Sequence, residues 1–106
     1  MIKSIRSLAV LAVAGCLAGS MGFAQASGEA VYKANCLSCH GSTGTPSPGI
    51  AKAMGVKAAS DPDLKKLSLD EEIQAVKNGK GKMKAFSGKL TDQQIKDSVT
   101  YYRTLK

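Results

Sequence analysis

Histidine, cysteine and tryptophan are all scarce in this sequence. It contains one histidine, three cysteines and no tryptophan, and Cys16 lies near the N-terminus. The other two cysteines, Cys36 and Cys39, are three positions apart, so a framework of several disulfides cannot hold the fold. A structural zinc ion takes about four nitrogen and sulfur ligands, and after residue 26 the chain offers only Cys36, Cys39 and His40. These shortages exclude a disulfide scaffold and argue against a zinc site.

Long hydrophobic runs are also missing. The main apolar stretch covers residues 8–15, follows two basic residues and is shorter than the roughly 20 residues that a membrane span needs. Residues 24–26 then read Ala-Gln-Ala, a small-x-small cleavage pattern. These features predict a signal peptide over residues 1–26 and a mature domain over residues 27–106, exported to the periplasm of a bacterium.

Cys16 leaves a second processing route open. Residues 13–16 read Val-Ala-Gly-Cys, which is similar to a bacterial lipobox, where the cysteine is lipidated and becomes the mature N-terminus. The residues after Cys16 are mostly small or apolar, unlike a polar tether. Cleavage after Ala26 is therefore favoured, with a soluble product. The alternative is a protein anchored in the membrane by a lipid on Cys16.

Acidic residues are the minority, with 8 Asp and Glu against 15 Lys and Arg. A basic excess can serve nucleic-acid binding, but export makes nucleic acid the wrong partner. An acidic protein surface or an anionic membrane face is the better complement.

No segment shows a sustained two-residue alternation of apolar and polar residues, so we predict no strands. Two capping-box patterns, Ser68 with Glu71 and Thr91 with Gln94, predict the starts of two helices. Leu90 can pack on the second helix as a hydrophobic staple. The sequence predicts an all-α domain of three to five short helices. Helical signals fall at residues 27–35, 50–54, 62–67, 69–78 and 92–105.

Cys36-Leu-Ser-Cys39-His40 is the attachment pattern for c-type haem. Two thiols separated by two residues can add to the two vinyl groups of one porphyrin, and the next residue, His40, is then delivered to the iron. A dithiol of the thioredoxin type would need a βαβ context, which this helical sequence lacks. We therefore predict one covalent haem c, held by Cys36 and Cys39, with His40 as the proximal iron ligand.

The opposite face of the iron has few candidates. His40 is the only histidine, so a second histidine of the same chain is excluded, and Met, Lys, water or an open position remain. Met54 is ordinary packing material. Met83 lies among lysines and glycines, which is poor core sequence, so we favour Met83 as the distal ligand. A thioether ligand raises the reduction potential and leaves no open site for a substrate.

With these residues in place, residues 27–106 resemble the class I cytochromes c. Gly28 and Tyr32 match the family's N-terminal helix, and Tyr101 matches the aromatic residue of its C-terminal helix. The resemblance implies that helices over 27–39 and 92–105 cross.

The resemblance also implies a proline carbonyl that accepts the ring N–H of the proximal histidine. Pro46 and Pro48 are both candidates, and we favour Pro48. Relatives often have a proline after the ligand methionine, where this chain has Lys84. Many relatives also place a tryptophan against a haem propionate, and this sequence contains no tryptophan.

Four lysines surround Met83, and they lead to a prediction about partners. An ordinary solvated loop would explain them, but they can also steer acidic redox proteins toward the haem edge. We expect a monomer that docks on such proteins. The lysines are Lys80, Lys82, Lys84 and Lys89.

Three classes of function compete. The leading one is an electron carrier, not an enzyme, that moves one electron between larger redox proteins. The second is a small haem enzyme or gas-binding protein, such as a peroxidase, which needs an iron face left open by Met83. The third is a haem-free thiol–disulfide protein.

Overall fold

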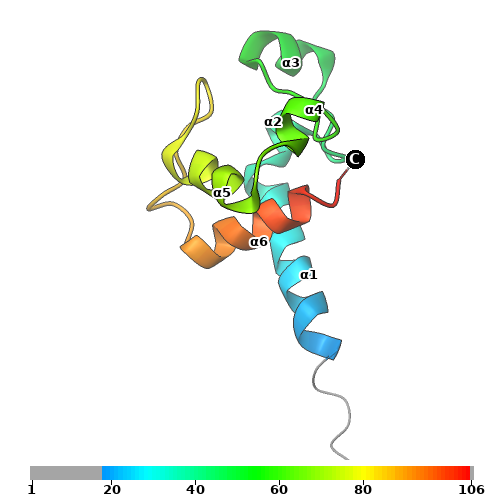
Figure 1. Cartoon of the computed structure of the whole chain (residues 1–106), viewed down its shortest axis with the longest axis vertical. Helices are drawn as coiled ribbons and strands as arrows, with labels where there is room; N and C mark the ends of the chain where they lie inside the picture. The colour runs from blue at the N-terminus through cyan, green and yellow to red at the C-terminus, as the bar shows by residue number, and fades with distance from the viewer. Residues whose placement is uncertain (1–17, 106) are drawn as a thin grey trace, which may run out of the picture.

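The computed structural model describes the backbone of residues 18–105 and the side chains of residues 27–105 (Figure 1). Most of the expected signal peptide, including Cys16, lies outside the described residues. The described chain is helical without strands, which confirms the all-α prediction, and it has six helices rather than three to five. They are α1 (Ala18–Asn35), α2 (Leu37–His40), α3 (Pro48–Met54), α4 (Pro62–Lys65), α5 (Leu69–Asn78) and α6 (Asp92–Tyr102).

The extra helix is α2, a single turn that carries the end of the Cys-x-x-Cys-His motif. The chain turns at Cys36, so α1 ends at Asn35 and a new turn begins at Leu37. Among the described residues, no helix has both the length and the apolar character that crossing a membrane requires.

Both predicted capping boxes are present. The Ser68 hydroxyl accepts from the Glu71 backbone N–H at 3.1 Å, and the Glu71 carboxylate accepts from the Ser68 N–H at 3.1 Å. Thr91 and Gln94 form the same pair of bonds at the start of α6, at 3.1 and 2.9 Å. Each box satisfies two N–H groups that a helix start would otherwise leave unpaired.

Other helix ends differ from the sequence-based bounds. Helix α3 begins two residues earlier than expected, because Ser47 caps it and Pro48 occupies its first position, where a missing N–H costs nothing. It ends at Met54, and the following Gly55 caps it with a φ of +68°, which suits glycine. Helix α4 ends two residues before the predicted position, and α6 stops at Tyr102 rather than at residue 105.

Helices α1 and α6 cross, as the resemblance implied, and Figure 1 shows α6 lying over α1. The contact is close at Gly28, where a Cβ atom would collide with the carbonyl oxygen of Asp97 and lie 3.2 Å from the Cβ of Tyr101. The Tyr32 ring is buried against Tyr101 and Tyr102, with ring centroids 5.4 and 5.9 Å apart. This crossing forms one half of the core.

The other half joins α5 to α6. Phe86, Ile95 and Val99 form a buried cluster. Leu90 packs against this cluster, as the staple prediction requires. The partly buried side chains that complete it from α5 and the following loop are Leu69, Ile73, Val76 and Met83.

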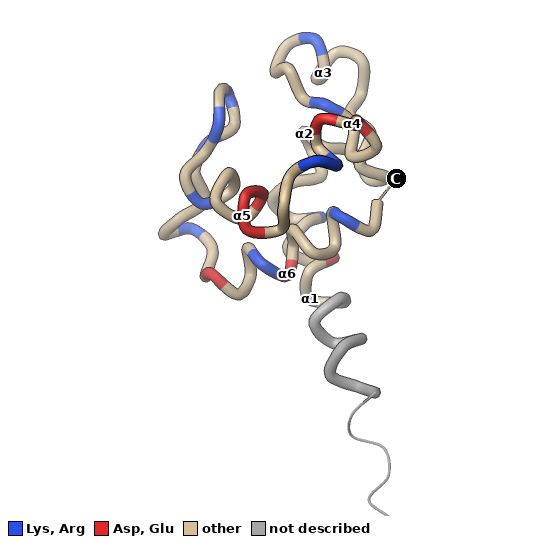
Figure 2. The backbone as a smooth tube through the Cα atoms, viewed as in Figure 1, with Lys and Arg blue, Asp and Glu red and all other residues tan. Residues whose placement is uncertain are grey.

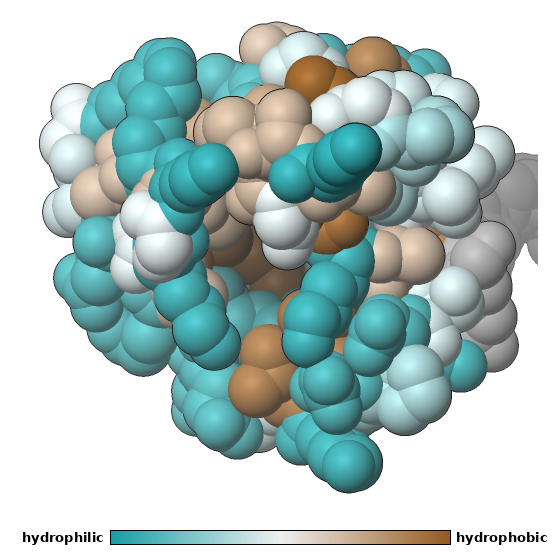
Figure 3. Space-filling model, turned by 90° about the horizontal axis from the view of Figure 1, so that it is seen from above, coloured by the Kyte–Doolittle hydropathy of each residue, from teal (hydrophilic) through white to brown (hydrophobic). Residues whose placement is uncertain are grey.

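A hollow opens beyond these packed helices. Figure 3, which views the molecule from the side of α3, shows a recess with hydrophobic residues in its floor and mostly hydrophilic residues around its rim.

Candidate haem-attachment site

The two predicted attachment cysteines lie on one turn of chain. The backbone N–H groups of Cys39 and His40 both donate to the carbonyl of Cys36, at 3.2 and 2.9 Å. Both thiols are free and only partly buried. Positions three apart on a helical turn face the same side, so the two sulfur atoms are available to one ligand. Burial, and secondarily the neighbouring Cys39, raises the pKa of the Cys36 thiol to about 11.

His40 is the last residue of α2, and its imidazole is suited to binding a metal. Its Nδ1 atom is buried without a hydrogen-bond partner, and burial lowers the pKa of the ring. A lowered pKa favours the neutral imidazole, which is the form that coordinates metals. The His40 and Tyr102 rings meet in an edge-type arrangement, with centroids 5.3 Å apart and planes 65° apart.

Met83 approaches from a different element, the loop between α5 and α6. It closes a tight turn in which the Lys80 N–H donates to the Met83 carbonyl at 3.0 Å and the Met83 N–H returns to Lys80 at 2.9 Å. Gly81 at the turn has a φ of +58°. The Met83 side chain is partly buried beside the α5–α6 cluster. Met54, in contrast, is 37% exposed at the end of α3.

Two prolines that follow α2 are the candidates for the hydrogen-bond acceptor of His40. Pro48 is the exposed first residue of α3, whereas Pro46 is buried in the preceding loop. The unpaired Nδ1 atom of His40 would need an acceptor if it carries the ring proton. Pro46 and Pro48 are the prolines nearest to His40 along the chain, and α2 contacts α3, which begins at Pro48.

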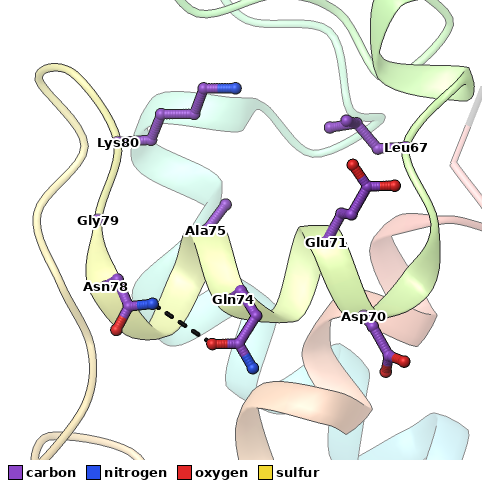
Figure 4. Close-up of a pocket in the computed structure, with 8 residues that line it drawn as sticks. All are labelled: Leu67, Asp70, Glu71, Gln74, Ala75, Asn78, Gly79 and Lys80. Carbon is purple, nitrogen blue, oxygen red and sulfur yellow. Dashed lines mark hydrogen bonds between the residues drawn. The ribbon is translucent and has the colours of Figure 1, made fainter.

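Two cavities flank the packed helices. One, of about 460 Å³, lies on the side of α5 opposite its core face, and Figure 4 shows Leu67, Glu71, Ala75 and Lys80 projecting to one side of the helix. On the other side of the helix in the same view, the amides of Gln74 and Asn78 are hydrogen-bonded at 3.3 Å.

The second cavity, of about 340 Å³, lies beside Tyr102 and is lined by Glu72 and Arg103 as well. Glu72 is paired with Arg103 at 3.1 Å. Its second carboxylate oxygen and the Tyr102 hydroxyl are both buried without a partner. Desolvation raises the pKa of Glu72, against the opposing pull of the Arg103 charge.

The donor atoms fit a haem. Two free thiols on one turn suit two thioether bonds, and an imidazole whose burial favours the neutral form suits iron. A partly buried thioether on a separate loop suits the opposite iron position. Neither cavity is lined by these four side chains, so the fit depends on the donor atoms.

Sequence reasoning missed the side chains around this site. The contact of Tyr102 with His40, the Glu72–Arg103 ion pair and a hydrogen bond from Lys82 to Ala53 all join residues distant in the chain. Tyr102 stood out only through helical spacing, which indicated burial and not its neighbour.

Comparison with known proteins identifies the relatives of this chain. Residues 23–101 match the family model described as cytochrome C oxidase, cbb3-type, subunit III. Cytochrome c6 of Leptolyngbya boryana is 38% identical over 76 residues, which cover 72% of this chain and 86% of that protein. Cytochrome c6 of Parathermosynechococcus lividus is 34% identical over 79 residues, covering 72% and 84%.

A solved structure is similar as well. The KustC0563 c-type cytochrome superposes with a TM-score of 0.67 at 28% identity, over 74% of this chain and 96% of that one.

Proposed function

This chain belongs to the small class I c-type cytochromes and is an electron-transfer protein with one covalently bound haem c, and we propose the residues that hold that haem. Cys36 and Cys39 form the thioether bonds, His40 binds the iron on one side and Met83 binds it on the other. The haem supplies a one-electron iron couple. The observation that carries the proposal is the single turn with two free thiols and the buried, unpaired imidazole.

In this proposal, His40 and Met83 occupy the two coordination positions of the iron that the porphyrin leaves free. The turn at Gly81 directs Met83 toward the body of the domain, where its side chain is partly buried. With both axial positions filled, no substrate reaches the iron, which suits a carrier. The alternative, a peroxidase-like enzyme or gas-binding protein with an open distal site, is not favoured because the relatives are cytochromes c6.

The proximal histidine needs a second interaction to fix its ring. We assign its Nδ1–H to the carbonyl of a proline that follows α2, with Pro48 at the start of α3 as the first choice and Pro46 in the preceding loop as the second. Such a bond orients the imidazole and increases its basicity toward iron.

We also propose that the protein works outside the cytoplasm. A signal peptide over residues 1–26 would release a domain that begins at Ser27 in the periplasm. Lipidation of Cys16 is the alternative. The intact mass of the purified protein distinguishes them, because the lipidated product would keep residues 16–26 and carry acyl chains on Cys16.

Redox partners are expected to dock at the loop that carries Met83. Figure 2 shows basic residues, all of them lysines, along this loop, and the four lysines around Met83 are all exposed. Acidic partner surfaces complement them, so association rates should fall steeply with ionic strength. Charge reversal at Lys84 and Lys89 should slow association, whereas reversal at Lys96 on α6 serves as the control. Equal rates for all of these variants would reject docking at this loop.

The visible spectrum tests the proposed ligands. Acid-acetone extraction of the denatured protein should leave the colour on the polypeptide, because thioether bonds survive it. The ferric protein should show the long-wavelength charge-transfer band of Met–iron ligation. Loss of colour on extraction would reject the attachment, and rapid cyanide binding without that band would reject Met83.

A further inference from the structure

We propose that Lys82 is a positioning residue that ties the Met83 loop to the end of α3 and so keeps Met83 at the iron. This inference rests on the proposed ligation by Met83. It assigns a second role to one lysine of a loop whose charges otherwise suggest docking alone.

The tie is a hydrogen bond across the molecule. The Lys82 ammonium donates to the backbone carbonyl of Ala53 at 2.7 Å, and 29 positions separate the two residues. The donor is charged, and charge-assisted hydrogen bonds are shorter and stronger than neutral ones. Figure 1 shows that the loop after α5 and helix α3 are separate segments, and the hydrogen bond of Lys82 links them.

The acceptor is suited to a cation. Ala53 lies in the last turn of α3, where carbonyl groups lack a partner four residues further along the helix. The Gly55 N–H satisfies Ala51, which leaves Ala53 for another donor. Partial negative charge at a helix C-terminus also attracts an ammonium group.

The donor is placed where it can control Met83. Lys82 directly precedes Met83 in the tight turn closed by Lys80 and Met83. The far end of the loop is held separately, by the Phe86 N–H on the Val76 carbonyl at 2.9 Å. Within residues 79–85, the described structure gives only the Lys82 bond as a link to α3. A restraint on Lys82 is therefore transmitted to Met83 through one peptide bond.

Lys84 offers a matched control. It lies on the other side of Met83, it is exposed and carries the same charge. No hydrogen bond or salt bridge of its side chain is found in the described part of the chain. Replacing either lysine by alanine removes one positive charge next to Met83, but only K82A removes the tie.

The experiment compares K82A, K84A and K82R in the ferric holoprotein. Cyanide can bind only after Met83 leaves the iron, so its binding rate reports how often Met83 is released. We expect K82A to bind cyanide roughly 1.4 to 5 times faster than wild type, since exposed charged contacts are worth about 0.2–1 kcal/mol. K84A should match wild type, and K82R should stay close to it because Arg can also donate.

The outcomes separate this inference from the proposed function. A wild-type protein without the Met–iron charge-transfer band would overturn both the ligation and the tie. A wild-type protein with that band, in which K82A and K84A bind cyanide at equal rates, would overturn the tie alone. Thermal unfolding of each variant by far-UV circular dichroism checks that a faster rate does not reflect general loss of stability.

Discussion

The crossing of α1 and α6 and the loop that carries Met83 are built in opposite ways. At the crossing, backbone meets backbone at Gly28, and the Tyr32 ring is only 2% exposed. At the loop, lysines and glycines are exposed, and a few single hydrogen bonds hold the turn. The first region can supply stability that does not depend on the iron. The second holds an iron ligand in a segment whose displacement breaks few contacts and therefore costs little free energy.

The largest effect is expected at the crossing. Replacing Gly28 by Val should destabilise the fold by about 3 kcal/mol or more, because the new side chain collides with the backbone of Asp97. Urea unfolding followed by far-UV circular dichroism measures this loss. G49A is the control variant, because a Cβ added at Gly49 meets no other atom within 4 Å. A G28V protein with wild-type stability would mean that the helices do not cross as described.

Replacing Met83 should have the opposite effect. It should change the redox properties of the protein and leave the stability of the fold almost unchanged. M83L should lose the charge-transfer band and lower the potential by roughly 0.1 V or more, since axial ligands set haem potentials over about 0.8 V. M54L removes the exposed methionine and should change neither property. Redox titration of the two variants decides between them. If M54L lost the band and M83L kept it, the ligand assignment would be reversed.

Tyr32 tests the crossing by a smaller change. Y32F removes the hydrogen bond from its hydroxyl to the Gly41 carbonyl and should cost about 1–2 kcal/mol. The loss should be visible at neutral pH as a lower unfolding midpoint in urea. A neutral substitution would mean that the Gly41 carbonyl finds another donor.

The same residue predicts a pH dependence. Desolvation raises the pKa of the Tyr32 phenol well above its ordinary value. Its contribution to stability is thus fully present below about pH 10, the unfolded value, and falls as pH rises further. Thermal unfolding measured at several alkaline pH values should fall more steeply in wild type than in Y32F. Parallel curves would contradict this.

The smallest expected effect is at the start of α6. T91A removes the hydroxyl that caps the Gln94 N–H and should cost about 1 kcal/mol without changing the haem spectrum. Thermal unfolding measures the cost. A spectral change in T91A would show that the start of α6 and the iron site are coupled, which would contradict this expectation.

The sequence predicts these two regions unequally well. Capping boxes are local patterns of four residues, so Ser68 with Glu71 and Thr91 with Gln94 were predicted and are confirmed. The crossing at Gly28 followed from family resemblance. The extra turn α2 was not predicted, because four residues carry no periodicity.

Contacts around the site could not be predicted from the residues alone. The pairing of Tyr102 with His40 and of Lys82 with Ala53 depends on how separate elements are placed in space. A buried tyrosine on a helix face and a lysine in a glycine-rich loop are both common, and neither type of residue indicates its partner.

Alkylation of the purified protein tests the central claim most directly. The protein is denatured, treated with iodoacetamide and weighed intact by mass spectrometry. We predict a mass that includes one haem, with neither Cys36 nor Cys39 alkylated. A mass without haem, in which both cysteines carry the alkyl group, would contradict the account.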